Sequence, residues 1–363
     1  MAPFPTSPAV ITDAWLTEAL IASGVLSGGE VVGHGVEPVG EHGAAAQTVR
    51  VRLSFDVSVP GLPDTVIAKF ASPHVSWRAL AAESGMYRRE VLFYDGLALR
   101  CGDVVPACHF ARFDRPSGAF ALLLEDMAPA RVGSLASPSV GDVESALNAI
   151  AAVHARFWDH ASRIRWLFSE NRPGVATARQ AMIEQALPQF LENDPGFAAS
   201  ATVRLARRLA ASFQSASVLL SADPATLVHG DFHLQNVFLP TERGGRLAVF
   251  DWQTAAKAAG PVDVARLLGT SLTPDQRREY ERRLLERYWR RLRSLGVEEY
   301  GFDGCWRDYL AGFVLSAFSN VLTGARMDLG QRADFEAASG IDVAAFFGRT
   351  DAAIEDHQVE QLL

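Results

Sequence analysis

The chain has 363 residues, of which 48% are hydrophobic and 21% charged, and its formal net charge is −8. This composition is typical of a globular protein, and the length allows two domains or two lobes with a cleft between them. The negative charge and the lack of a basic stripe argue against a nucleic-acid-binding protein.

The N-terminal residues lack the basic segment and apolar core of a signal peptide, and no apolar run approaches the ~20 residues that span a bilayer. Three scattered cysteines, Cys101, Cys108 and Cys305, form neither a disulfide framework nor a zinc-ligand pattern. We therefore expect a cytoplasmic protein, monomeric or homodimeric, with no nucleic-acid or membrane partner.

The first 130 residues contain several segments with a clear period or a continuous apolar run. Alternation of polar and apolar residues indicates a strand, and apolar residues at spacings of three and four indicate a helix. The segments predict a helix that begins at Asp13 and ends near Ser23 and Gly24, strands at 47–55 and 64–72, and a helix at 77–98. They also predict a short strand from Phe120 that stops at the acidic pair Glu125 and Asp126. We expect residues 1–126 to form a lobe built on a twisted antiparallel sheet with one main helix.

The rest of the chain is mostly helical in pattern. Thr273 and Pro274 are suited to the N-cap and first position of a helix. The segments predict helices at 141–160, 176–191, 201–217 and 273–296, and short strands at 236–239 and 247–250. The chain is therefore expected to be an α+β protein with a helical lobe at 127–363 and a hinge at about 124–130.

Four pieces of the sequence carry groups suited to chemistry. Lys69 lies in an apolar strand, Glu90 lies in the helix that follows, "HGDFHLQN" begins at His229, and Asp251 follows a short apolar strand. Each piece alone is weak, because a strand lysine is usually solvated and a helix glutamate usually lies on the surface. Together they supply a cation for phosphates, an acid to hold it, a base and oxygen ligands for Mg²⁺, which phosphoryl transfer requires.

The spacing of these residues fits such a site. Asp231 and Asn236 are five residues apart in one loop, so a base and a metal ligand can face one cleft. A turn-rich segment separates Asn236 from Asp251, and a hairpin there would return the chain to the same metal. Glu90 is the preferred partner of Lys69, with Glu83 as an alternative seven residues earlier.

The sequence resembles the aminoglycoside phosphotransferase and choline kinase-like superfamily, small-molecule kinases with a bilobal protein-kinase-like fold. "HGDFHLQN" resembles the family's His-Gly-Asp-x-x-x-x-Asn loop, and "FDWQ" resembles its Asp-Trp metal-binding element. "VIAKF", "REVLFY", "LLLEDM" and "AAVHARFW" match in kind and order, so the resemblance spans roughly residues 36–268. The details favour the branch that includes ecdysteroid kinase-like proteins.

The resemblance implies an ATP- or GTP-dependent and Mg²⁺-dependent kinase of a small-molecule hydroxyl. Asp231 would be the base, Asn236 and Asp251 would hold Mg²⁺, and Lys69, fixed by Glu90, would contact the α- and β-phosphates.

Other roles follow from the same resemblance. His229 would shape the catalytic loop, and backbone groups near Glu125 and Met127 would bind adenine. Three residues could sandwich the base, although simple core packing explains them equally well: Ala68, Phe238 and Phe250.

Two further positions belong to this comparison. Asp263 resembles the family's buried aspartate that braces the catalytic loop. The phosphate loop is expected near Gly40 and Gly43, but the segment lacks a full G-x-G-x-x-G pattern.

Two other functions remain open. A metal-dependent hydrolase could use His229, Asp231 and His233, which alternate as zinc ligands sometimes do, but this leaves Lys69 and Glu90 unexplained. A nucleotide-binding pseudokinase is the other alternative, although the complete set of candidate catalytic residues argues against it.

The acceptor is not identified by any motif. Its expected walls are residues 157–200 and 300–350. Residues 328–363 carry eight acidic residues against two arginines, which could attract a cationic substrate such as an amino sugar, or could form an exposed acidic surface. The candidate wall residues are Trp158, Trp166, Phe168, Trp306, Tyr309, Phe313, Phe318 and Asn320.

Overall fold

The computed structural model describes residues 4–39, 46–221 and 223–363. The chain divides into two compact units, which we describe separately. The sheet unit comprises Met1–Ala130 and Pro240–Thr254, and the helical unit comprises Arg131–Leu239 and Ala255–Leu363. The sequence did not indicate that residues 240–254 group with the N-terminal residues, and the predicted division after residue 126 stays a prediction.

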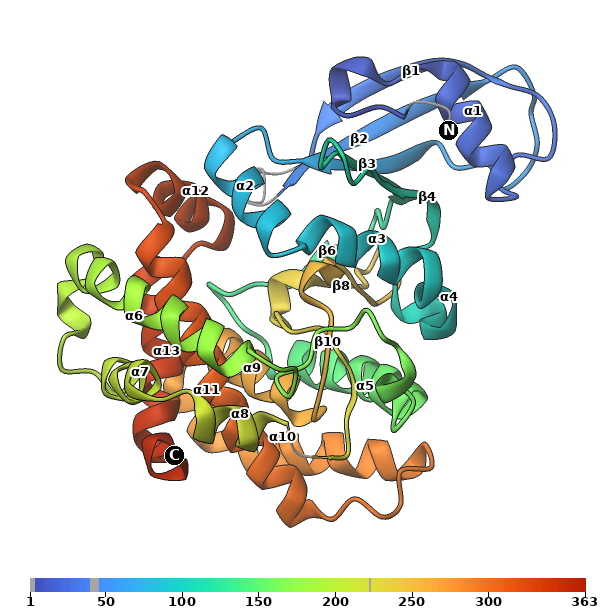
Figure 1. The fold of residues 1–363 in the computed structure, drawn as a ribbon. Helices are drawn as coiled ribbons and strands as arrows, with labels where there is room; N and C mark the ends of the chain where they lie inside the picture. The colour runs from blue at the N-terminus through green and yellow to red at the C-terminus, as the bar shows by residue number, and fades with distance from the viewer. Residues whose placement is uncertain (1–3, 40–45, 222) are drawn as a thin grey trace. The chain divides into compact units, whose positions relative to one another are not determined.

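The sheet unit is built on a five-stranded antiparallel sheet in the order β1-β2-β3-β5-β4 (Figure 1). Its central strand, β3, has no exposed residue, as its apolar sequence "TVIAKFA" favours. Helix α1 begins after Thr12, whose side chain accepts a hydrogen bond from the Trp15 amide, and packs its apolar residues into the core beside the sheet. The strands are β1 (Val31–Pro38), β2 (Ala46–Phe55), β3 (Thr65–Ala71), β4 (Cys108–Phe113) and β5 (Phe120–Glu125), with β9 (Ala248–Val249) outside this sheet.

The predicted helix at 77–98 is wrong in one respect, because it is broken in two. Gly85 has a φ of +72°, a left-handed conformation that ends one helix and begins the next. The apolar period continues across the break, so the pattern alone did not reveal it. The helices of this unit are α1 (Asp13–Ala22), α2 (Val75–Glu83), α3 (Met86–Gly96) and α4 (Ala98–Cys101).

The helical unit is organised around the long helix α11, which packs against α6, α9 and α13. The predicted helix at 201–217 is also divided, because Ser212 adopts an extended conformation between α7 and α8. The helices are α5 (Val140–Phe157), α6 (Val175–Asn193), α7 (Ala201–Ala211), α8 (Gln214–Leu220), α9 (Pro261–Ser271), α10 (Pro274–Ser294), α11 (Phe302–Arg326), α12 (Leu329–Ser339) and α13 (Val343–Asp356).

Short strands of the helical unit form two antiparallel pairs. One pair joins β7 (Thr226–Val228) to β10 (Ala256–Ala258), and the other joins β6 (Arg131–Val132) to β8 (Val237–Leu239). The pairs hold both ends of the loop between β7 and β8, which contains the predicted catalytic residues.

Short 3₁₀ turns complete both units. They are Pro8–Val10, Gly102–Val104, Ala161–Arg163, Pro195–Phe197, Leu234–Asn236, Trp252–Thr254 and Val359–Leu362.

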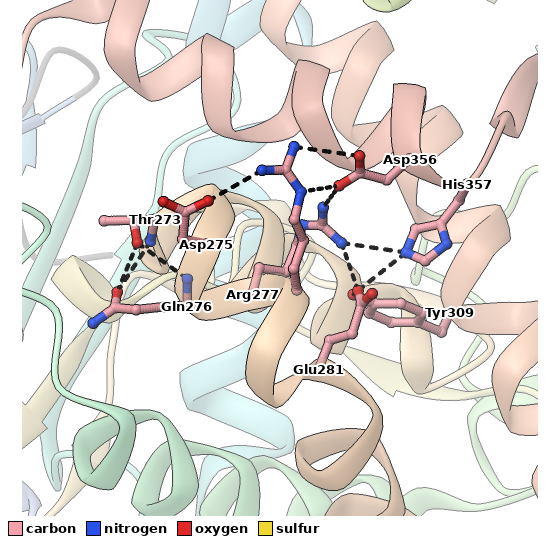
Figure 2. Close-up of polar contacts among 9 residues, drawn as sticks. Thr273, Asp275, Gln276, Arg277, Glu281, Tyr309, Asp356 and His357 are labelled. Carbon is pink, nitrogen blue, oxygen red and sulfur yellow. Dashed lines mark hydrogen bonds and ion pairs between the residues drawn. The ribbon is translucent and has the colours of Figure 1, made fainter.

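Helix α10 begins as the sequence predicts, with Thr273 as its N-cap in a capping box with Gln276. Figure 2 shows an ion cluster one turn later, which we call the α10 cluster. Arg277, only 1% exposed, donates to Glu281 at 2.7 Å and to Asp356 at the end of α13. His357 and the Tyr309 hydroxyl also contact Oε2 of Glu281, both at 3.0 Å. The cluster ties the C-terminal residues to α10.

None of the helices in the described parts of the chain combines the length and the apolar character that crossing a membrane requires.

Candidate active site

The sheet unit brings Lys69, Glu90 and Asp251 together. Lys69 lies on β3 with its Nζ 2.7 Å from Oε1 of Glu90 and 2.7 Å from Oδ1 of Asp251. Glu90 is on α3 and only 1% exposed, whereas the alternative partner, Glu83, is an exposed residue at the end of α2. The predicted lysine–glutamate pair is therefore present.

The three charged groups shift the pKa values of Lys69 and Glu90. Burial acts to lower the pKa of Lys69, but the carboxylates of Asp251 and Glu90 outweigh burial and raise the pKa above its ordinary value. Lys69 therefore stays a cation. Burial raises the pKa of Glu90 to about 7, against the opposing charge of Lys69.

Asp251 is held in an unusual backbone conformation. Its φ of +66° is rare for a residue other than glycine, and such strain is concentrated at functional sites. The next residue anchors it, because the Trp252 ring stacks on Phe93 of α3 at 4.2 Å and its Nε1 donates to the Val249 carbonyl. Oδ2 of Asp251 accepts a hydrogen bond from Gln253 at 3.1 Å.

In the helical unit, Asp263 braces the loop that follows β7. Its Oδ2 accepts the His229 amide at 2.6 Å, its Oδ1 accepts the Gly230 amide at 2.9 Å, and His154 contacts it from α5 at 3.2 Å. All these partners except Gly230 are fully buried. This is the bracing contact that the resemblance predicted for Asp263.

His229 contributes to the shape of the same loop. Its Nδ1 accepts a hydrogen bond from the Asp231 amide at 3.3 Å, while its ring is fully buried. Gly230 has a φ of +85°, so the turn between the two residues needs a glycine.

Asp231 keeps a partly accessible carboxylate, with its side chain 34% exposed. Oδ1 accepts from Nε of Arg266 at 3.1 Å and lies 3.0 Å from its Nη2, and Oδ2 lies 3.5 Å from Nε2 of His233. Partial burial acts to raise the pKa of Asp231, but the positive charges of His233 and Arg266 hold it well below its ordinary range. Asp231 is therefore an ionised acceptor of hydrogen bonds.

Arg266 was missed by the sequence analysis. It lies one helical turn after Asp263 on α9, a helix whose other residues are almost all buried. The sequence feature that could have indicated Arg266 is a single arginine in an apolar helix, three residues after Asp263 and therefore on the same helix face.

Asn236 is oriented as a metal ligand would be. Its Nδ2 donates to the Asp231 carbonyl at 2.9 Å, so the amide oxygen is left for other contacts, and the residue is almost fully buried. Amide and carboxylate oxygens are ligands that Mg²⁺ prefers, so Asn236 and Asp251 each suit this ion. They belong to different units, and their joint binding of one metal stays a prediction.

The residues predicted to contact the nucleotide are spread over both units. Gly40 and Gly43, predicted for the phosphate loop, lie outside the described residues. Ala68 is fully buried in the core beside the sheet, which favours core packing, while Phe250 and Phe238 are half-buried in the sheet and helical units, respectively.

The predicted hinge borders a pocket of the sheet unit. A pocket of about 300 Å³ is lined by residues 125–129 and by Gly245 and Arg246. Glu125 forms an ion pair with Arg246 at 2.5 Å, and its amide donates to the Ala107 carbonyl, so this amide is occupied within the unit. The Met127 carbonyl accepts the Ala130 amide.

The predicted acceptor walls separate into core residues and one site residue. Tyr309 and Phe313 are buried in the core, and the half-buried Trp306 joins them around the His357 ring. Asn320, in contrast, accepts a hydrogen bond from Arg266, the partner of Asp231. Phe168 and Phe318 flank the Arg179 guanidinium, and Trp158 packs on Tyr300 beside a separate pocket of about 890 Å³.

Most of the C-terminal acidic residues have structural partners. Six of the eight make hydrogen bonds or ion pairs, which favours a structural role over attraction of a cationic substrate. These six are Asp328, Asp342, Asp351, Glu355, Asp356 and Glu360.

The hydrolase hypothesis rested on His229, Asp231 and His233 as ligands of one metal ion. Within residues 4–39, 46–221 and 223–363, no group of three or more His, Cys, Asp or Glu side chains is placed to hold a metal ion. His229 instead accepts a backbone hydrogen bond inside the loop.

Comparison with solved structures supports the fold. An aminoglycoside 2′-phosphotransferase in complex with GDP has a TM-score of 0.51 at 12% identity, covering 96% of this chain and 100% of that one. A spectinomycin phosphotransferase in complex with ADP and spectinomycin has a TM-score of 0.50 at 11% identity, with coverage of 98% and 100%. A putative aminoglycoside phosphotransferase from Ralstonia eutropha JMP134 has a TM-score of 0.50 at 19% identity, with coverage of 93% and 98%.

These similarities confirm the predicted α+β, protein-kinase-like fold. No curated protein matches the sequence. The model of the phosphotransferase enzyme family matches residues 64–295, which is more than half of the chain and contains every candidate catalytic residue described above. The chain therefore belongs to the phosphotransferase enzyme family, and it is a small-molecule kinase.

Proposed function

We propose that this protein transfers the γ-phosphoryl group of ATP, or alternatively GTP, to a hydroxyl of a small molecule in a Mg²⁺-dependent reaction. The observation that carries the proposal is the state of Asp231. Its loop is fixed by Asp263 through two backbone amides, yet its carboxylate remains ionised and partly accessible. A fixed, accessible carboxylate is what a kinase needs to orient and deprotonate an acceptor hydroxyl.

The remaining residues supply the other parts of phosphoryl transfer. Lys69, kept charged by its two carboxylates, would bind the α- and β-phosphates, with Glu90 fixing its position. Asn236 and Asp251 would hold Mg²⁺, which neutralises charge on the phosphate oxygens when it is bound. The acceptor oxygen would form the new bond to phosphorus as the bond to the leaving nucleotide breaks, and its proton would pass to Asp231.

The acceptor class is left open between an amino sugar, an antibiotic and another alcohol. The structural partners of the C-terminal acidic residues remove the main argument for a cationic acceptor. Arg266 beside Asp231 also places a positive charge near the proposed acceptor position.

The test is a screen for ADP release with Mg-ATP and a panel of amino sugars, aminocyclitols, amino alcohols and neutral alcohols. We expect acceptor-dependent ADP release by the wild-type protein and release that is slower by about 10²–10⁴-fold in Asp231→Asn. Nucleotide binding without turnover of any acceptor would favour a pseudokinase. Tightly bound zinc together with no nucleotide binding would favour the hydrolase.

A further inference from the structure

Arg266 is the side chain that fixes the carboxylate of Asp231. Two nitrogens of its guanidinium contact the same carboxylate oxygen, with Nε at 3.1 Å and Nη2 at 3.0 Å from Oδ1. Because both contacts are to Oδ1, this ion pair differs from the bidentate pair in which arginine contacts both oxygens of a carboxylate.

The guanidinium is itself held from two other helices. Its Nη1 donates to Oδ1 of Asn320 on α11 at 2.9 Å, and it lies over the Phe346 ring of α13 at 5.4 Å. Arginine only donates hydrogen bonds, so the orientation of the Asn320 amide is determined by this contact. Asn320 is 1% exposed, and Arg266 has a side-chain exposure of only 12%. The guanidinium therefore has little freedom to turn, and the carboxylate that it grips has little freedom either.

This arrangement makes the two oxygens of Asp231 unequal. Oδ1 is occupied by Arg266, whereas Oδ2 lies 3.5 Å from Nε2 of His233, which is too long for a good hydrogen bond. Rotation of the carboxylate would exchange the oxygens, and the grip on Oδ1 opposes this rotation.

We propose that Arg266 is a positioning residue of the phosphotransferase, which holds Asp231 by Oδ1 so that Oδ2 faces the acceptor hydroxyl. This proposal rests on the function proposed above. In the reaction the acceptor proton passes to Oδ2 as the new oxygen–phosphorus bond forms and the bond to the nucleotide breaks. Arg266 gains and loses no proton, and it acts only through Asp231.

The main test compares Arg266→Met, which removes the charge but keeps the apolar stem, with Arg266→Lys, which keeps the charge. With an acceptor identified by the screen, we expect Arg266→Met to lower kcat by about 10²-fold, because a misplaced catalytic group costs this much. KM for ATP should change by less than about threefold, since binding of the nucleotide is not altered. Arg266→Lys should recover part of kcat.

Guanidinium in solution gives an independent readout. In Arg266→Ala, added guanidinium chloride at millimolar concentration should restore part of kcat, whereas sodium chloride at the same concentration should not. A merely structural arginine would not show such rescue in the folded variant.

The matched control is Arg332→Met. Arg332 on α12 also pairs with a carboxylate, donating to both oxygens of Asp194 at 2.8 and 2.7 Å in the same unit. Its loss should lower the melting temperature with kcat of the folded protein unchanged. If Arg266→Met does not fold, kcat is measured instead in Arg266→Lys and in Phe346→Leu, which changes the ring under the guanidinium. An unchanged kcat in both variants overturns the proposal.

The two proposals fail in different ways. If the wild-type protein phosphorylates no acceptor, the proposed function fails. The role of Arg266 is then judged from crystal structures of the wild type and of Arg266→Met. A carboxylate of Asp231 that keeps its orientation without Arg266 overturns the positioning role, and a carboxylate that turns or occupies two orientations supports it.

Discussion

Two arginine–carboxylate groups of the helical unit, at Asp231 and in the α10 cluster, contain the same kind of ion pair but differ in how many hydrogen-bond partners the carboxylate has. In the α10 cluster, Oε2 of Glu281 is shared by Arg277, His357 and the Tyr309 hydroxyl, so its hydrogen-bonding capacity is consumed internally. At Asp231 one oxygen is held by Arg266, and the other lies 3.5 Å from Nε2 of His233. An incompletely satisfied carboxylate on a rigid support is what we expect of a catalytic base, whereas the fully engaged carboxylate of Glu281 is expected to be structural.

The largest effect is expected from Asp231→Asn. We predict that kcat falls by about 10²–10⁴-fold, the range attributed to general base catalysis. The amide keeps the size of the side chain, so the melting temperature should stay near that of the wild type. ADP release and thermal unfolding, measured on the same preparation, check both parts. Activity within tenfold of the wild type would rule out Asp231 as the base.

The opposite pattern is expected from Arg277→Met in the α10 cluster. Removing the buried arginine takes away the arginine partner of the largely buried Glu281 and leaves Asp356 with Arg278 alone, which should reduce the free energy of unfolding by about 3–5 kcal/mol. Denaturant unfolding measures this loss, and kcat of the folded protein should be retained.

The neighbouring Arg278→Met is the matched control for Arg277→Met. Arg278 contacts the same Asp356 but is about half exposed, so its removal should cost only about 0–1 kcal/mol. Equal losses in the two variants would contradict the view that burial distinguishes them.

A smaller and different effect is expected from Asp251→Asn. Loss of the carboxylate should weaken Mg-ATP binding by about 10–100-fold, the range for a disturbed metal site. Asparagine is preferred to alanine because it tolerates the positive φ of Asp251. Calorimetric titration with and without Mg²⁺ tests this prediction. Equal affinity of the variant and the wild type for Mg-ATP would count against a metal ligand at this position.

The smallest effect is a dependence of stability on pH. Burial acts to raise the pKa of Glu281, but His357 and Arg277 outweigh it and lower the pKa below the usual 4.5. A carboxyl with a lowered pKa in the folded state stabilises the protein above about pH 4.5. This contribution is lost as the pH falls through the lower folded value. The free energy of unfolding should therefore decrease between pH 5 and pH 3, with a shallower slope in Glu281→Gln. Identical slopes in the two proteins would refute the contribution of Glu281.

Parts of the fold and site could be predicted from the sequence because they are local or strongly constrained. The strand with Lys69 is apolar on both sides, and Glu90 lies in the helical segment that follows it. Their pairing could be predicted because the two residues are only 21 positions apart in the sequence. Thr273 and Pro274 begin α10 as predicted, since capping depends on adjacent residues.

Other features depend on contacts that one sequence does not reveal. Gly85 interrupts a helical period that continues on both sides of it. Arg266 meets Asn320 across 54 residues and Asp231 across 35, and no local pattern links these positions. Most of the C-terminal acidic residues are exposed, as the composition favoured, but their contacts with distant residues could not be predicted for the same reason.

The α10 cluster has a consequence for proteolysis. Asp356 neutralises Arg277, while Glu355 and Glu360 pair with Arg204 of α7 and Asp351 caps the start of the same helix. A nick before residue 351 would release acidic partners of two helices at once and leave the buried Arg277 with Glu281 as its remaining carboxylate. Susceptibility of this segment to a protease should therefore follow global unfolding, and the segment should not be trimmed as a loose end would be.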